Sequence, residues 1–208
     1  MRRIGLAIAI SLLAGLALPA AAAAGCSASS AEDWSQCGDR AFDKGDYPAA
    51  VTAYEEALRL VQHDYEVRYN IAQVELELKN YDAVIRHIGI FMEDRPDVAL
   101  AFDLRGLAFM GKRDYDAALQ DFSEAVRLKP QSYGFLYDRG TAHHAAGAYE
   151  TAIADYSAVI AIEPEFADAF YQRGRAYRKL GDEARAKEDL AAAKRLDPTV
   201  ATRLGELL

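Results

Sequence analysis

Apolar residues recur along this chain with a helical spacing, and the whole pattern repeats every 34 residues. Between residues 31 and 200, apolar stretches come in pairs that a polar turn separates, as at Gly45-Asp46-Tyr47. Prolines at positions 96, 130, 164 and 198 follow the second stretch of their pairs. Because proline stops a helix, the spacing predicts where each pair ends. The pattern therefore predicts five units of two helices: 31–64, 65–98, 99–132, 133–166 and 167–200.

Side-chain size at equivalent places of the units indicates how the two helices of a pair meet. The eighth place is small, holding Gly38, Ala72, Gly106, Gly140 and Gly174. The twentieth is mostly alanine, at Ala50, Ala118, Ala152 and Ala186, with Val84 in the second unit. The twenty-fourth is large, holding Tyr54, Ile88, Phe122, Tyr156 and Leu190. One such hairpin cannot bury its apolar face alone, whereas five stacked hairpins bury a continuous core.

This order of small and large places resembles the tetratricopeptide repeat family over residues 31–200, with Trp34 at the fourth place of the first unit. The resemblance implies an all-α fold, a right-handed superhelical α-solenoid of five helix-turn-helix repeats. Residues 201–208 restart the phase with Leu204, Leu207 and Leu208, which predicts a short C-terminal cap. A tail that docks on a partner is the alternative for this segment.

The first residues have the pattern of an export signal. Arg2 and Arg3 precede an uncharged stretch over 4–18, which Pro19 and a run of alanines follow. The stretch is shorter than the roughly 20 residues that a membrane-spanning helix needs, so a retained anchor is the less favoured alternative. We expect a signal peptide over 1–24, with cleavage after Ala22 or Ala24, a linker over 25–30, and a periplasmic or secreted protein.

Two cysteines, Cys26 and Cys37, lie near the predicted start of the mature chain. An oxidising compartment would allow a disulfide between them. The run Ala23-Ala24-Gly25-Cys26 also resembles a bacterial lipoprotein signal, in which Cys26 would carry the lipid. Lipidation of Cys26 would exclude the disulfide, and it would make the protein membrane-anchored.

The charge and the motifs restrict the classes of function. The formal net charge is −8, and removing Arg2 and Arg3 with the signal brings it to −10. An acidic protein repels nucleic acid and favours basic protein partners. We find no catalytic motif, no metal-ligand spacing and no cofactor loop; His143 and His144 are adjacent on a helix and point about 100° apart, so they cannot grip one metal together. The sequence therefore predicts a protein that is not an enzyme and needs no metal or cofactor.

Two places in the repeat gain and lose charge together. The seventh and twenty-third places are arginine and aspartate in the last three units and uncharged in the first two, apart from His87 at the twenty-third place of the second. Such covariation within one chain predicts contact between the two places. The expected structural ion pairs are Arg105 with Asp121, Arg139 with Asp155, and Arg173 with Asp189.

The resemblance also implies a ligand-binding concave face, formed by the first helices of the units. The places that face the ligand in the family predict partner-binding residues Tyr69, Asn70, Asp103, Leu107, Tyr137, Asp138, Tyr171, Arg175 and Arg178. The three tyrosines would form one wall, as aromatic anchors of a binding surface or, alternatively, as packing residues. Charge is graded from acidic at the N-terminal end to basic at Arg175 and Arg178, which would orient a bound segment.

These observations predict a non-catalytic scaffold or adaptor that binds a peptide segment or helix of a partner protein in its concave groove, in the cell envelope. One alternative is a structural subunit of an envelope assembly that docks by the ends or the convex face of the array. Another alternative is cell-wall glycan binding.

Overall fold

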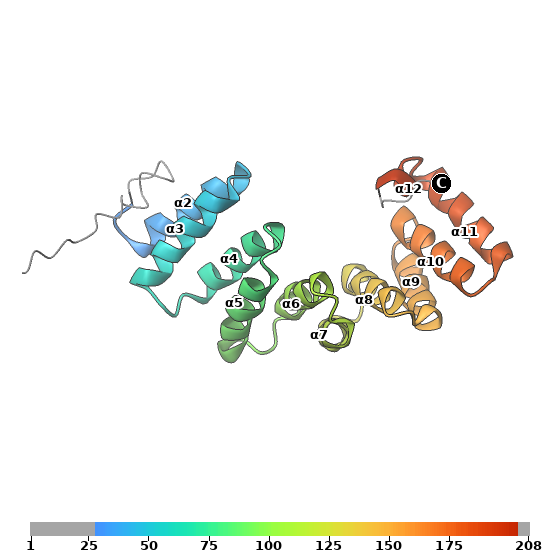
Figure 1. Cartoon of the computed structure of the whole chain (residues 1–208), viewed down its shortest axis with the longest axis horizontal. Helices are drawn as coiled ribbons and strands as arrows, with labels where there is room; N and C mark the ends of the chain where they lie inside the picture. Colours follow the sequence, from blue (N-terminus) through green and yellow to red (C-terminus); the bar gives the residue numbers. More distant parts are fainter. Residues whose placement is uncertain (1–27, 204–208) are drawn as a thin grey trace, which may run out of the picture.

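The computed structural model describes residues 28–203, which form five consecutive helical hairpins and a short last helix (Figure 1). The helices are α2 (Ala31–Asp43), α3 (Tyr47–Leu60), α4 (Tyr65–Glu77), α5 (Tyr81–Asp94), α6 (Ala99–Gly111), α7 (Tyr115–Leu128), α8 (Tyr133–Ala145), α9 (Tyr149–Ile162), α10 (Ala167–Lys179), α11 (Glu183–Leu196) and α12 (Val200–Arg203). The predicted all-α solenoid is confirmed, and the first helix of each pair begins where its predicted unit begins.

Several sequence-based predictions fall on residues that the structure does not describe. The signal peptide over 1–24, Cys26, and the leucines of the predicted cap lie outside residues 28–203. Within those residues, no helix combines the length and the apolar character that crossing a membrane requires.

Local sequence sets the starts of the helices. Asp46, Asp64, Asp114 and Asp182 each accept a hydrogen bond from a backbone N–H in the first turn of the helix that follows. Ser30 does the same for α2 and, with Asp33, forms a capping box. Because these N–H groups have no partner within the helix, the side chains fix the first residue of each element.

The turn inside a hairpin requires one residue with a positive φ. Glycine supplies it at Gly45 and Gly181, where φ is 73° and 80°. Lys79 and Arg113 adopt φ of 60° at the equivalent place of their hairpins. Only glycine enters this region without a steric cost, so these two turns store a small strain.

Within a hairpin, the small eighth place faces the large twenty-fourth place. A Cβ added to Gly38 would lie 2.5 Å from the ring of Tyr54, and one added to Gly106 would lie 2.7 Å from the ring of Phe122. Those distances are below any real carbon–carbon contact, so glycine lets the aromatic ring lie flat against the first helix. The aromatic ring thus sets the distance between the two helices.

The hairpins stack side by side into an open arc (Figure 1). Successive first helices, α4 with α6, α6 with α8 and α8 with α10, contact one another, so they line the inner side of the arc. At the C-terminal end, Val200 of α12 is buried against Tyr171 and Ala193 of the last hairpin. This contact covers part of the apolar face that the last hairpin would otherwise expose.

Candidate partner-binding groove

We call the inner face of the arc, formed by the exposed sides of α2, α4, α6, α8 and α10, the groove. The structure places the predicted partner-binding residues on four of these helices. They are Tyr69 and Asn70 on α4, Asp103 and Leu107 on α6, Tyr137 and Asp138 on α8, and Tyr171, Arg175 and Arg178 on α10.

Two cavities open in the N-terminal half of the groove, and Asn70 lines both. The first, which we call the acidic cavity, has a volume of about 200 Å³ and is lined by Asp39, Phe42, Asp43, Tyr54, Asn70 and Gln73. The second, which we call the apolar cavity, has a volume of about 310 Å³ and is lined by Glu66, Tyr69, Asn70, Phe91, Arg95, Val98 and Leu100. The two cavities are therefore neighbours along the array.

The acidic cavity holds two carboxylates one helical turn apart on α2. The hydroxyl of Tyr54 donates a hydrogen bond of 2.6 Å to Oδ1 of Asp39. Burial and the carboxylates of Asp39 and Asp43 keep the pKa of Tyr54 far above its ordinary value, so the phenol stays a donor. Phe42 lines the cavity and is 37% exposed, and its ring centroid lies 5.8 Å from that of Tyr47.

Beyond the apolar cavity, the side chains of Asp103 of α6 and Asp138 of α8 lie beside each other. Burial and the neighbouring Asp138 carboxylate raise the pKa of Asp103 to about 7, and burial raises the pKa of Asp138 to about 6. The pair therefore shares one proton near neutral pH. Among the described residues, no group donates a hydrogen bond to the buried Oδ1 of Asp103.

The three predicted tyrosines differ in what they contact. Tyr69 lies against Phe91, with ring centroids 5.6 Å apart, and remains partly exposed at the apolar cavity. Tyr137 is also partly exposed and lies 5.2 Å from the ring of Phe166. Tyr171 is only 3% exposed and packs in the core of the last hairpin, so it does not form part of an open wall. The packing alternative thus describes Tyr171, because Val200 of α12 covers its ring.

The charge along the groove changes sign from one end to the other. Asp39 and Asp43 are exposed on α2, whereas Arg178 and Lys179 are exposed on α10. Arg175 donates to Gln172 over 2.9 Å and lies above the ring of Tyr171. Leu107 is half-buried between these regions and packs near Ala118 and Phe122. The gradient gives the groove a direction for a charged ligand.

Behind the groove, the three predicted Arg–Asp pairs are brought together. In each pair, Nε and Nη2 of the arginine donate to the two carboxylate oxygens, at distances between 2.6 and 2.9 Å. The aspartates keep 6–7% of their side-chain area exposed and the arginines 19–26%. This fork geometry joins the two helices of a hairpin and raises the pKa of each arginine through its hydrogen bonds to aspartate.

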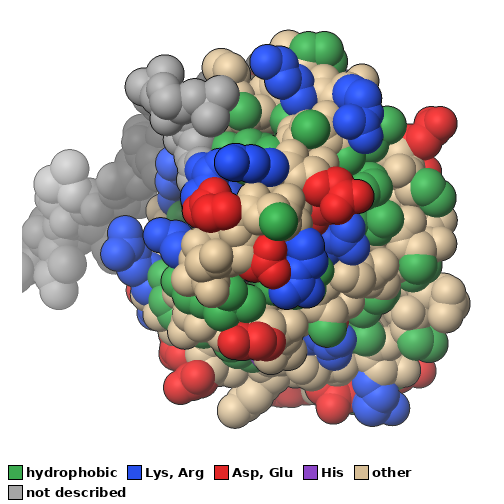
Figure 2. Space-filling view, turned by 90° about the vertical axis from the view of Figure 1, so that its right-hand side faces the viewer, with side chains coloured by type: hydrophobic (Ala, Val, Ile, Leu, Met, Phe, Trp, Pro, Cys, Tyr) green, Lys and Arg blue, Asp and Glu red, His purple; other side chains and the backbone are tan. Residues whose placement is uncertain are grey.

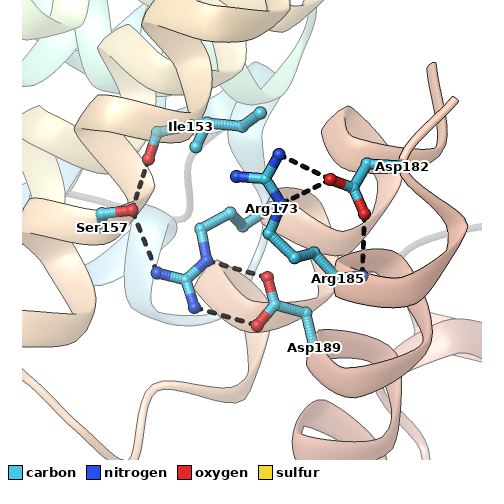
Figure 3. A network of polar contacts seen from close by, with 6 residues as sticks. All are labelled: Ile153, Ser157, Arg173, Asp182, Arg185 and Asp189. Carbon is cyan, nitrogen blue, oxygen red and sulfur yellow. Dashed lines mark hydrogen bonds and ion pairs between the residues drawn. The ribbon is translucent and has the colours of Figure 1, made fainter. Parts of the chain in front are cut away.

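Arg173 also connects two hairpins (Figure 3). Its Nη1 donates over 3.0 Å to Oγ of Ser157 on α9, and that hydroxyl donates over 2.6 Å to the carbonyl oxygen of Ile153. Arg185 and Asp182 form a separate ion pair within one turn of α11. Arg173 therefore fixes the last hairpin to the one before it.

At the equivalent places of the first two hairpins, the contacts are of another kind. In the first hairpin, Cys37 of α2 stands at the place of the arginine and is 2% exposed and disulfide-bonded. Ala53 of α3, which packs against α2, stands at the place of the aspartate. Because Cys26 lies outside the described residues, its pairing with Cys37 stays a prediction. In the second hairpin, Ile71 is fully buried and His87 is 8% exposed. Burial, with the charges of Arg86 and Arg68, lowers the pKa of His87 to about 4, so it is neutral at physiological pH.

Sequence reasoning missed the cavities and the shared proton. Asp103 and Asp138 were predicted separately, one at the fifth and one at the sixth place of neighbouring first helices. Leu100 occupies the second place of its unit, which faces the ligand in the family, but it was not among the predicted residues; Val98 immediately precedes α6. Among the described residues, no group of three His, Cys, Asp or Glu side chains is arranged to hold a metal ion.

The C-terminal end of the arc has a mixed surface. Figure 2 shows Lys and Arg side chains interspersed with Asp and Glu over this end, with scattered hydrophobic side chains between them. Such a surface has no single-sign field that would steer a charged partner to it. Along the groove, by contrast, the charge is graded and two neighbouring cavities share Asn70.

Models of one repeat family match most of the helical part of the chain. A tetratricopeptide repeat model matches residues 38–83, a second matches residues 99–132 and 167–200, and a TPR repeat model matches residues 140–181. Among curated relatives, the BBSome complex member BBS4 of Mus musculus is 26% identical over 95 residues, which are 46% of this chain and 18% of that protein. The Hsp70-Hsp90 organising protein of Plasmodium falciparum (isolate 3D7) is 24% identical over 96 residues, which are 43% of this chain and 17% of that protein. The chain thus spans about a fifth of the length of the curated relatives it matches.

Solved structures share the whole arc. A crystal structure of MamA protein aligns with a TM-score of 0.73 at 21% identity, covering 86% of this chain and 97% of that chain. YrrB, described as a TPR protein with an unusual peptide-binding site, aligns with a TM-score of 0.69 at 20% identity, covering 85% and 92%. MamA from Desulfovibrio magneticus RS-1 aligns with a TM-score of 0.76 at 19% identity, covering 81% and 96%. At these identities the likeness concerns the fold alone.

Proposed function

Because the chain belongs to the tetratricopeptide repeat family, we propose that this protein–protein interaction scaffold holds a segment of its partner, extended or helical, in the groove. The observation that carries the proposal is the row of the acidic cavity, the apolar cavity and the Asp103–Asp138 pair along successive first helices. A bound segment would cross these helices and contact all three features in order.

Relatives support the choice of a protein partner. The name of the Hsp70-Hsp90 organising protein refers to two other proteins, and YrrB is described as having a peptide-binding site. The groove of this chain offers what a peptide needs: cavities for side chains and polar groups beside them. The family and fold are typical of adaptors without catalytic activity.

The proposal includes the cell envelope as the place of action. The basic, apolar and small-residue order of residues 1–24 supports export, as does the pair of cysteines with a disulfide-bonded Cys37. Fusing residues 1–30 to a reporter enzyme that is active only outside the cytoplasm tests this part. An inactive reporter would exclude the export signal.

Photo-crosslinking at single positions tests the groove without disturbing the fold. A photoreactive amino acid is placed at Leu100 or Thr141 in the groove, and at Leu60 or Leu196 on second helices. Leu60, Leu100 and Leu196 are 51%, 47% and 42% exposed, so Leu60 and Leu196 are controls that match Leu100 in residue type and exposure. We expect one envelope protein to crosslink at positions 100 and 141 but not at 60 or 196. Crosslinks at 60 or 196 alone would instead support docking by the outer face.

A further inference from the structure

We propose that the N-terminal half of the groove recognises a partner segment with one large apolar side chain between two basic side chains. The inference rests on the proposed function, because it names the chemistry of the segment that the groove would hold. The large side chain would enter the apolar cavity, one basic side chain the acidic cavity, and the other would meet the Asp103–Asp138 pair.

Apolar side chains form most of the wall of the apolar cavity. Val98, Phe91 and the ring of Tyr69 form its walls, and Leu100 borders it while 47% exposed. An exposed leucine beside buried aromatic rings gains free energy when another apolar group covers it. Glu66 and Arg95 provide a polar rim, and Arg95 is engaged with Asp94 at 3.6 Å.

The acidic cavity lies on the N-terminal side of the apolar cavity and suits a cation. Asp39 and Asp43 supply two carboxylates, and the Tyr54 hydroxyl donates a hydrogen bond to Asp39. The exposed ring of Phe42 offers a face to a lysine ammonium or an arginine guanidinium. The combination of carboxylates and an aromatic face favours a basic side chain over an apolar one.

The Asp103–Asp138 pair lies on the other side and brings two carboxyl groups together on neighbouring first helices. Oδ1 of Asp103 is buried and accepts no hydrogen bond from residues 28–203, so the negative charge of the pair is not compensated there. Two carboxylates this close repel each other, and a basic side chain placed beside them in the groove would reduce that repulsion. A bound basic side chain would therefore favour the ionised form of the pair.

The rest of the groove sets the limits of the basic segment. The C-terminal end of the groove carries Arg175, Arg178 and Lys179. These positive charges would repel the basic residues of a bound segment. The segment should therefore lie over α2, α4, α6 and α8, with its basic residues confined to this stretch. Charge complementarity and the order of the two cavities thus choose this occupant over a second copy of the chain, whose net charge is negative.

Fluorescence anisotropy with three labelled peptides of equal length tests the proposal. The first peptide has a phenylalanine between two lysines, the second replaces both lysines by glutamate, and the third replaces the phenylalanine by serine. At low salt and pH 8 we expect the first peptide to bind at least tenfold more tightly than either of the others. The variant Leu100→Arg and the double variant Asp103→Asn with Asp138→Asn should each weaken the first peptide at least tenfold.

Matched controls separate binding from folding and from general charge. Leu196→Arg repeats the leucine change on α11, and Glu150→Gln removes an exposed carboxylate on α9; both should bind the first peptide as the unaltered protein does. Equal affinity for the three peptides, or equal losses in the controls, would overturn the proposal. If a glutamate-containing or neutral peptide binds and Leu100→Arg abolishes that binding, the groove function stands and only the basic–apolar–basic preference fails.

Discussion

The first two hairpins and the last three have the same backbone plan but hold their helices together differently. Hairpins three to five place a bidentate Arg–Asp pair between the seventh and twenty-third places. Hairpins one and two place apolar residues and a neutral histidine there, with Cys37, Ile71 and His87 buried. Replacing a buried ion pair by apolar residues of similar volume often changes stability little or increases it, so both kinds of contact can hold a hairpin together.

The groove differs along its length in the same sense. The acidic cavity lies between the first two hairpins, and the apolar cavity extends from the second hairpin to the first turn of the third. The last three hairpins carry the ion pairs, and Arg173 adds a bond to the neighbouring hairpin through Ser157. Both groove cavities thus share α4 of the second hairpin, whose helices no Arg–Asp pair joins among the described residues.

The largest effect should come from breaking one ion pair. Arg139→Met leaves the carboxylate of Asp155 buried without its partner, so we expect the free energy of unfolding to fall by about 2–4 kcal/mol. Adding Asp155→Leu, which makes the fourth hairpin resemble the second, should recover most of that loss. Urea denaturation of the two variants and the unaltered protein measures both values. A double variant as unstable as the single one would contradict this explanation, because the loss would then not come from the unpaired carboxylate of Asp155.

The second prediction concerns His87, the group that stands in for the aspartate in the second hairpin. Its pKa is lowered from 6.5 to about 4, so the neutral form stabilises the fold above pH 6.5. That stability is lost as the pH falls from 6.5 through 4, by about 2 kcal/mol. His87→Leu should lose less stability than the unaltered protein when unfolding is measured at pH 7 and pH 4.5. Parallel curves for the two proteins would contradict a neutral buried histidine.

The third prediction concerns the close packing of a glycine at the eighth place against the large residue at the twenty-fourth place. Gly106→Ala would bring a Cβ within 2.7 Å of the Phe122 ring, so we expect a cost of about 1–3 kcal/mol. Gly89→Ala in α5 is the matched control, because nothing lies within 4 Å of the added Cβ. The control should stabilise by about 0.5–1 kcal/mol, since alanine favours a helix interior. Thermal unfolding followed by circular dichroism measures both, and a neutral Gly106→Ala would refute the close packing.

The smallest effect should come from the carboxyl pair in the groove. The pKa values of Asp103 and Asp138 are raised, so the pair contributes stability that is complete below about pH 4 and lost as the pH rises through 6 to 7. Tyr69 on α4 is the other titratable group that faces Asp103, and burial and Asp103 raise its pKa further above neutrality. Replacing both aspartates by asparagine should gain about 1 kcal/mol over the unaltered protein between pH 6 and pH 7. An unchanged difference across this range would exclude the shared proton.

The sequence predicted the parts of the fold that repeat. Prolines, glycines and the seventh and twenty-third places recur in phase, so the hairpins and the partners Arg105 and Asp121 follow from spacing alone. The burial of Tyr171 did not follow, because Val200, the last residue of the fifth unit, begins the additional helix α12 and packs in one cluster with Tyr171. The apolar cavity was also missed, since side chains of α4, α5 and the start of α6 form it together and spacing along one helix does not give that shape.

The hydrogen bond between Arg173 and Ser157 joins two hairpins through residues at defined places of the repeat. Ser123 occupies in the third hairpin the place that Ser157 occupies in the fourth, and Arg139 occupies that of Arg173. Excising residues 133–166 would therefore bring Arg173 against Ser123, with the same two groups meeting across the new join. An array shortened by this one hairpin would thus keep the same residue types at its new join, and its groove would be shorter by one repeat.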